Sequence, residues 1–196
     1  MSDSTSHVVV AVVLRARGGR LEVLLAGDAA PAASLAPREA LETALGRAVD
    51  LALLAHVEQL ATRALADGSI ATAYLGLVSS DSGLEGDWRP VAEVELPFVA
   101  AAQSRLRAKL SYTNVGFALA PASFTISELR EVYIAALGHD VSATNLQRVL
   151  VRRGVLARAV GQRASGRTGG RPAALFRFAS SRLEVTDEFA ALRPPR

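Results

Sequence analysis

Residues 161–168, GQRASGRT, nearly match the phosphate-binding pattern G-x-x-x-x-G-K-[ST], with Arg167 in the place of the lysine. Such a loop binds phosphate because a helix begins directly after it and points its backbone N–H groups at the anion. Here GGRP follows at 169–172, which does not begin a helix smoothly, and the fork of an arginine does not replace the compact charge of a lysine. We therefore expect these arginines to meet the phosphates of a polymer rather than those of a bound nucleotide.

The charge of the chain is concentrated in its second half. Residues 1–98 contain 7 Lys and Arg against 13 Asp and Glu, and residues 99–196 contain 15 against 6, so the two net charges are −6 and +9. Residues 141–182 hold nine arginines and no acidic residue. A solvated surface normally mixes both signs, so a stretch of one sign indicates a polyanionic partner such as nucleic acid. An arginine-rich composition does not explain why acidic residues are absent from residues 141–182 in particular.

Residues suited to catalysis or metal binding are few. Cysteine is absent, which excludes disulfides, zinc–thiolate sites and cysteine nucleophiles. The histidines His7, His56 and His139 show no metal-ligand spacing. Glu39 and Glu42 are three residues apart on a predicted helix and could share a metal, although a solvated helix face is the simpler interpretation. We predict no catalytic residue, no metal ligand and no cofactor.

The segment 143–154 predicts an amphipathic helix whose polar face is suited to DNA. Leu146, Val149 and Leu150 recur at i, i+3 and i+4 and should pack inward. The other face carries residue types that contact base edges and phosphates in a major groove, where a merely solvated helix would also carry acids. We predict groove contacts from Thr144, Asn145, Gln147 and Arg148, and phosphate or minor-groove contacts from Arg152, Arg163, Arg167 and Arg171.

The elements around this helix predict a winged helix-turn-helix. Thr125 and Glu128 have the spacing of a capping box before a helix over 126–138, and Ser142 can cap the helix that follows. A helix over 98–112 precedes them, and short strands over 155–160 and 173–178 flank the glycine-rich stretch. The glycines should therefore lie at the tip of a hairpin, the wing, and not in a loose tail.

The first half predicts a mixture of strands and one helix. We expect a hairpin from strands 7–16 and 21–27, a loop over 28–37, a helix over 38–48, a second hairpin from 51–64 and 70–80, and a short edge segment over 88–98. The fold class is thus α+β, with a first domain over 1–98, a winged helix-turn-helix domain over 99–182, and a frayed tail over 183–196. No signal peptide is expected, and the longest apolar run, 8–14, is too short for a membrane span, so we expect a cytoplasmic protein.

Several short motifs together resemble the Nudix-related transcriptional regulators, the NrtR family. In the second half these are RLRAKLSY at 105–112, FALAP at 117–121, FTISEL at 124–129 and GGRPAALFRF at 169–178. In the first half, residues 56–78 and WRPVAEVELPF at 88–98 are similar to two further family segments. The resemblance covers most of the chain and implies a Nudix-like domain followed by a winged helix-turn-helix.

The resemblance implies a DNA-binding repressor, often of NAD-metabolism genes. Members of this family are typically homodimers that bind pseudo-palindromic operators and respond to ADP-ribose or a related nucleotide. The catalytic Nudix pattern G-x5-E-x7-R-E-U-x-E-E-x-G-U is degenerate in this sequence. With Arg38–Glu39 as the R-E pair, Glu42 matches one acid, but Thr43 replaces the other and Leu45 replaces the glycine; a register placed on Gly46 loses both acids. We therefore predict no hydrolase activity.

Two other functions stay open from the sequence. A Nudix-type pyrophosphohydrolase acting on ADP-ribose-like substrates would need an unusual metal site at Glu39 and Glu42. A winged helix that binds protein instead of DNA would need an acidic partner for the arginine-rich stretch.

Overall fold

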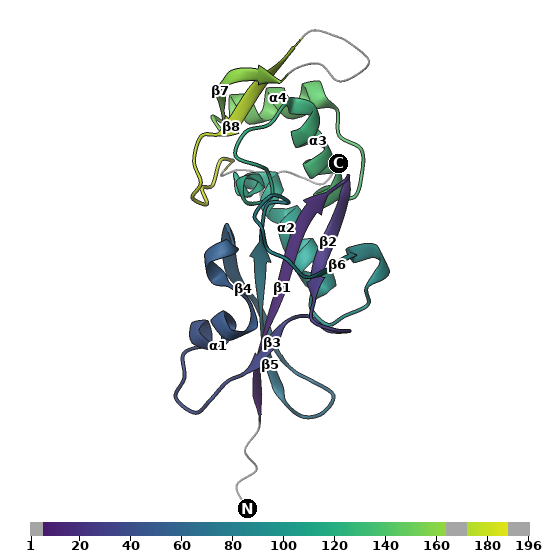
Figure 1. Cartoon of the computed structure of the whole chain (residues 1–196), viewed down its shortest axis with the longest axis vertical. Helices are drawn as coiled ribbons and strands as arrows, with labels where there is room; N and C mark the ends of the chain where they lie inside the picture. The colour runs from purple at the N-terminus through teal and green to yellow at the C-terminus, as the bar shows by residue number, and fades with distance from the viewer. Residues whose placement is uncertain (1–5, 164–171, 188–196) are drawn as a thin grey trace, which may run out of the picture. The chain divides into compact units, whose positions relative to one another are not determined.

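The protein is described by a computed structural model that covers residues 6–163 and 172–187 (Figure 1). The chain divides into two compact units, one of residues 1–15 and 21–105 and the other of residues 16–20 and 106–196. No helix within the described residues is both long and apolar enough to cross a membrane.

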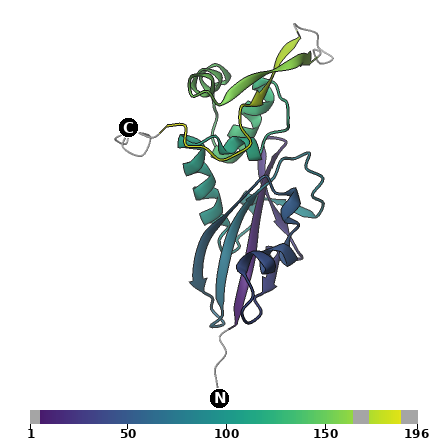
Figure 2. The same ribbon diagram turned by 90° about the vertical axis from the view of Figure 1, so that its left-hand side faces the viewer.

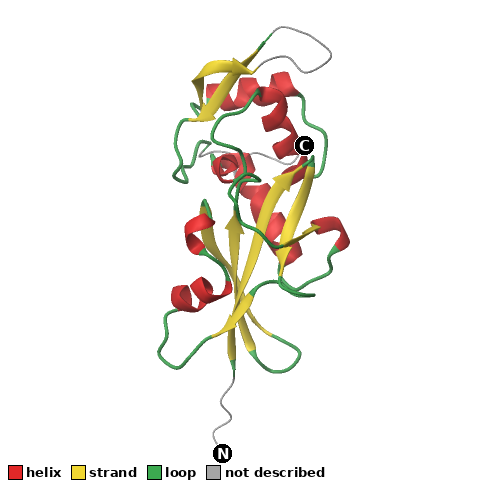
Figure 3. Ribbon diagram, in the orientation of Figure 1, coloured by secondary structure: helices red, strands yellow, loops and turns green. Residues whose placement is uncertain are grey.

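The first unit is built on one mixed sheet (Figure 3). The strand order is β4-β5-β1-β2-β6, and β3 pairs with β1 outside this path. β1 runs parallel to β5, whereas β4 is antiparallel to β5 and β2 is antiparallel to β6. The strands are β1 His7–Arg17, β2 Arg20–Leu25, β3 Ala32–Ser34, β4 His56–Ala64, β5 Ile70–Leu77 and β6 Asp87–Pro90.

The central strands are buried on both faces, which explains their continuous apolar sequences. Figure 2 shows helix α1, Leu41–Ala48, on one face of the sheet and the beginning of α2, Val99–Tyr112, on the other. Ala44 and Leu45 of α1 pack into a core cluster with alternate residues of β1, including Val9 and Val13. The two hairpins and the edge strand expected from the sequence are present in this sheet. Two of their bounds differ, because β4 begins only at His56, after a 3-10 turn, and β6 ends at Pro90.

Two further local expectations in this unit were wrong. The segment 28–37 is not all loop, because β3 pairs with β1 through residues 32–34. The helix expected from residue 38 begins only at Leu41, since Arg38 has a φ of 64° and cannot belong to a right-handed helix. Glu39 therefore precedes α1 and does not share a helical face with Glu42.

The second unit contains the end of α2, then α3 over Ile126–Leu137 and α4 over Ala143–Arg152. The capping box at α3 is confirmed: Thr125 accepts from the N–H of Glu128, whose carboxylate accepts from the N–H of Thr125. Ser142 caps α4 by accepting from the N–H of Asn145. Short 3-10 turns over Leu51–Leu53, Val91–Glu93 and Val115–Ala118 complete the helical elements of the described chain.

The wing consists of the antiparallel strands β7, Leu156–Arg163, and β8, Ala173–Phe178. β7 runs three residues farther than the sequence predicted, with a bulge between Arg158 and Gln162. Phe124 adds a third, one-residue strand: its backbone exchanges two hydrogen bonds with Phe176 at 2.9 and 2.8 Å. This bridge ties the wing to the segment that leads into α3.

The expectation of a frayed tail was wrong for residues 183–187. Val185 forms a β-bridge with Thr113, and the backbone N–H groups of Thr186 and Asp187 donate to the carbonyl of Tyr112 at 2.8 and 3.1 Å. This segment is thus a packed part of the second unit.

Candidate nucleic-acid interface

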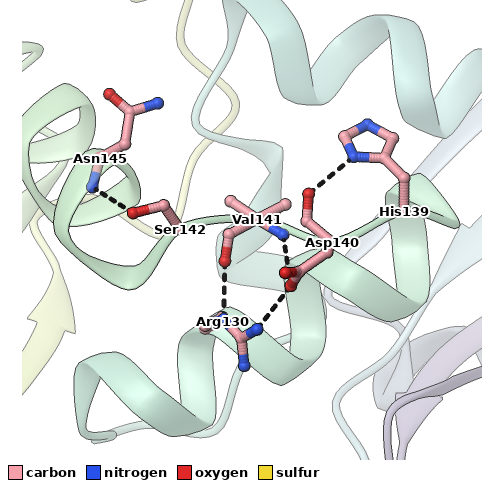
Figure 4. Close-up of polar contacts among 6 residues, drawn as sticks. All are labelled: Arg130, His139, Asp140, Val141, Ser142 and Asn145. Carbon is pink, nitrogen blue, oxygen red and sulfur yellow. Dashed lines mark hydrogen bonds and ion pairs between the residues drawn. The ribbon is translucent and has the colours of Figure 1, made fainter.

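The turn between α3 and α4 is fixed by one arginine of α3 (Figure 4). Nε of Arg130 donates to the carbonyl of Val141 at 2.6 Å, and its terminal nitrogen binds the carboxylate of Asp140. The same carboxylate accepts from the N–H of Val141 at 2.8 Å. The backbone entering α4 is therefore held from the preceding helix before Ser142 caps the first turn of α4.

The packing of α4 sets which of its residues reach solvent. Leu146 and Leu150 are 6% and 2% exposed, and Val149 is half-buried, so this side faces the core as expected. Of the residues predicted to contact DNA from this helix, Gln147 is half-buried and the others are exposed: Thr144, Asn145, Arg148 and Arg152. The terminal nitrogen Nη2 of Arg148 donates to Oδ1 of Asn145 at 2.7 Å. These two side chains thus form one polar unit on the exposed face.

Val151 is a residue of this face that the sequence prediction missed. It follows Arg148 by three positions and Thr144 by seven, so the three lie on one side of the helix. Val151 is 50% exposed, although it is apolar. An apolar side chain among Thr, Asn and Arg gives this surface a group suited to the methyl group of thymine.

Two described arginines of the wing differ in their contacts: one forms an ion pair and the other lies near an aromatic ring. Arg163, the last residue of β7, forms an ion pair with Glu128 at 3.0 Å, and the two side chains are 49% and 37% exposed. Arg158 is exposed, with its guanidinium 5.9 Å from the ring centroid of Phe176. The other two predicted wing contacts, Arg167 and Arg171, lie outside the described residues.

The two carboxylates considered for a metal come from different local structures, because Glu39 precedes α1 and Glu42 lies in its first turn. Glu39 accepts from Arg47 and from the N–H of Ala36, and the hydrogen bond from Arg47 is the main cause that lowers the pKa of Glu39. Glu42 is exposed on α1. Within residues 6–163 and 172–187, no group of three or more His, Cys, Asp or Glu side chains could hold a metal ion.

Two pockets within the described residues of the first unit differ in their lining. One, of about 290 Å³, is lined by the carboxylates of Asp28, Glu93 and Glu95 together with the single guanidinium of Arg89. Another, of about 200 Å³, has an apolar lining that includes Val8, Val10 and Phe98. A nucleotide pyrophosphate favours Arg, Lys or helix N-termini, so the first of these two pockets, with three acidic residues and one arginine, is not suited to it.

Comparison with known proteins finds a family model that matches part of the second unit. Residues 116–178 match a family model described as the NrtR DNA-binding winged helix domain. A curated relative, the ADPR responsive transcriptional repressor NtrR of Acinetobacter baylyi, is 35% identical over 76 residues, 39% of this chain. The match spans 29% of the length of that relative.

Solved structures extend the likeness to most of the chain. The crystal structure of Shewanella oneidensis NrtR complexed with a 27mer DNA is 25% identical, with a TM-score of 0.70 over 87% of this chain and 92% of that chain. A MutT/nudix family protein from Enterococcus faecalis, 16% identical, has a TM-score of 0.64 over 92% of this chain and 90% of that one, and so shares the fold. The resemblance and the fold class inferred from the sequence are confirmed.

Proposed function

We propose that this chain, an NrtR-type winged helix domain joined to a Nudix-like fold, is a DNA-binding transcriptional repressor. The observation that carries the proposal is the exposed face of α4, which presents Asn145 and Arg148 as a hydrogen-bonded pair beside a wing without acidic residues. A matching winged helix domain and a similar structure crystallised on a 27mer DNA support it.

The contacts divide by chemistry. The first two turns of α4 are the part of a recognition helix that reaches base edges. They carry the four residues assigned to groove contacts: Thr144, Asn145, Gln147 and Arg148. Arg152 and Arg163 lie at the end of α4 and on the wing, where they bind phosphates and fix the register without reading sequence. Arg167 and Arg171 are assigned the same role from the sequence alone.

We propose the assembly from the family resemblance, and the effector from the name of one relative. A homodimer bound to a pseudo-palindromic operator would place two α4 helices about one helical turn of DNA apart, ~34 Å. One relative is named as ADPR responsive, and we propose that ADP-ribose or a related nucleotide also governs this repressor, acting on NAD-metabolism or neighbouring genes.

We propose further that the Nudix-like unit does not hydrolyse nucleotides. Hydrolysis of a diphosphate needs clustered carboxylates to hold divalent metal ions, and Glu39 is already bound by Arg47. Purified protein should therefore leave ADP-ribose intact in the presence of Mg²⁺. Cleavage that disappears in Glu42→Gln would instead establish the hydrolase.

One experiment tests the function directly. Purified full-length protein is used to select fragments of genomic DNA, and the selection is repeated with ADP-ribose, with NAD and with an unrelated ligand. We expect a symmetric motif to be enriched. ADP-ribose should change the degree of its enrichment, and the unrelated ligand should not. The absence of any enriched motif, or binding that does not weaken with added salt, would exclude the proposal.

A further inference from the structure

We propose that residues 182–187, called the strap below, belong to the DNA-reading apparatus because they hold the end of α4 in place. This inference rests on the proposed function. The strap lies beyond the segment 116–178 that matches the winged helix family, so the match does not account for it. The strap follows β8 and appears as the yellow segment beside the end of α2 in Figure 2.

One end of the strap is anchored on Asn114, just after α2. Asn114 is 3% exposed, and the amide nitrogen of its side chain donates to the carbonyl of Arg182 at 2.8 Å. Its amide oxygen accepts from the N–H of Glu184 at 2.8 Å, and its backbone N–H donates to the carbonyl of Glu184 at 3.1 Å. A buried amide that uses both its donor and its acceptor on one segment fixes that segment in a single register.

The other end of the strap reaches the last turn of α4. Oδ2 of Asp187 accepts from Nη2 of Arg153 at 2.9 Å, and the two side chains are only 10% and 11% exposed. Arg153 is the C-cap of α4, and its backbone N–H donates to the carbonyl of Val149 at 3.0 Å. Removing one partner of such a pair leaves a largely buried charge without its counterion, which is costly.

Together these contacts make α4 a helix held at both ends. Arg130 of α3 fixes the backbone before α4, and Asp187 fixes the residue after it. Base-edge contacts depend on helix orientation far more than phosphate contacts do, since hydrogen bonds to bases require close alignment. The strap should therefore support sequence discrimination and contribute little to general affinity for DNA. Asp187 is on this argument a positioning residue.

The test compares Asp187→Asn with Glu184→Gln in the full-length protein. Both variants remove one negative charge from the strap, but the Glu184 contacts to Asn114 use its backbone alone. Affinity is measured for the selected operator and for a scrambled duplex of equal length. We expect Asp187→Asn to lose roughly 3- to 30-fold in operator affinity and to bind the scrambled duplex as well as the wild type or better. Glu184→Gln should keep the wild-type ratio between the two duplexes.

A second variant and a measurement without DNA keep the proposal falsifiable. Asn114→Ser releases the other end of the strap without changing the charge and should lower the same ratio. Hydrogen exchange of the free protein should quicken at residues 149–153 in Asp187→Asn and in Asn114→Ser. If these two variants keep the wild-type ratio of the two affinities and the wild-type hydrogen exchange, the inference is wrong. Equal losses of affinity for the operator and for the scrambled duplex would also overturn it, because they indicate general destabilisation. If the wild type itself prefers no sequence, the proposed function fails, while hydrogen exchange still decides whether the strap holds α4.

Discussion

Arg148 and Asn145 are joined side chain to side chain on the exposed face of α4, with 2.7 Å between Nη2 and Oδ1. The spacing of three residues places them one above the other on the helix. The bond uses one of the five N–H donors of the guanidinium and leaves the others for a ligand. The pair thus has a limited set of arrangements before DNA arrives, which reduces the entropy lost on binding.

Replacing Arg148 should therefore be the most damaging change on this surface. We expect Arg148→Ala to cost about 1–3 kcal/mol of operator binding and to relax the base preference at one position of each half-site. Arg89→Ala, which removes the same charge from an exposed site on β6, is the matched control and should leave the affinity unchanged. Titration of labelled operator by fluorescence anisotropy measures both. Unchanged binding by Arg148→Ala would mean that α4 is not the recognition helix.

Val151 should report on thymine. Its half-exposed side chain lies on the same side of α4 as Arg148 and can contact the C5 methyl group of a thymine. We expect Val151→Ala to weaken operator binding, and replacement of one operator thymine by uracil to weaken wild-type binding by a similar factor. The two losses should not add when combined, because they remove the two sides of one contact. Additive losses at every thymine position would place Val151 away from the bases.

Local signals explain why the sequence predicted the helix-turn-helix so well. The capping box of Thr125 and Glu128 and the cap at Ser142 depend on residues three positions apart, and both lie where expected. The wing strands were equally visible, because apolar strand residues flank the glycines. Val151 was missed for a related reason: an apolar residue in an amphipathic helix is normally part of the core.

Contacts between distant residues explain what the sequence could not predict. Asn114 and Glu184 are 70 positions apart, and Arg153 and Asp187 are 34 apart, so no local pattern indicates the strap. The three residues of β3 are a strand only because β1 lies beside them. Likewise the hydrogen bond from Arg47 to Glu39 joins residues eight positions apart, and no local pattern indicates it.

Gly154 should be needed for the turn from α4 into β7. Its φ is +68°, and a Cβ added there would meet no heavy atom within 4 Å. The cost of Gly154→Ala is then conformational alone, and we expect a loss of about 1 kcal/mol in the free energy of unfolding. Denaturant unfolding followed by circular dichroism measures it, with Gly68→Ala in the β4–β5 turn, φ +83°, as a reference of the same kind. A neutral Gly154→Ala would mean that the chain leaves α4 by another backbone conformation.

Glu128 should restrain Arg163 until DNA competes for it. Both side chains are more than a third exposed, so the ion pair contributes about 0–1 kcal/mol and is readily exchanged for a phosphate. Glu128→Gln keeps the capping box, because glutamine also accepts from the N–H of Thr125, and it frees the guanidinium of Arg163. We expect this variant to bind DNA up to about fivefold more tightly at low salt. A general effect of removing an acid would give the same gain, so the decisive comparison is made in an Arg163→Gln background. In that background, Glu128→Gln should no longer tighten DNA binding if Arg163 contacts phosphate. A gain in affinity of equal size would mean that Arg163 does not contact DNA.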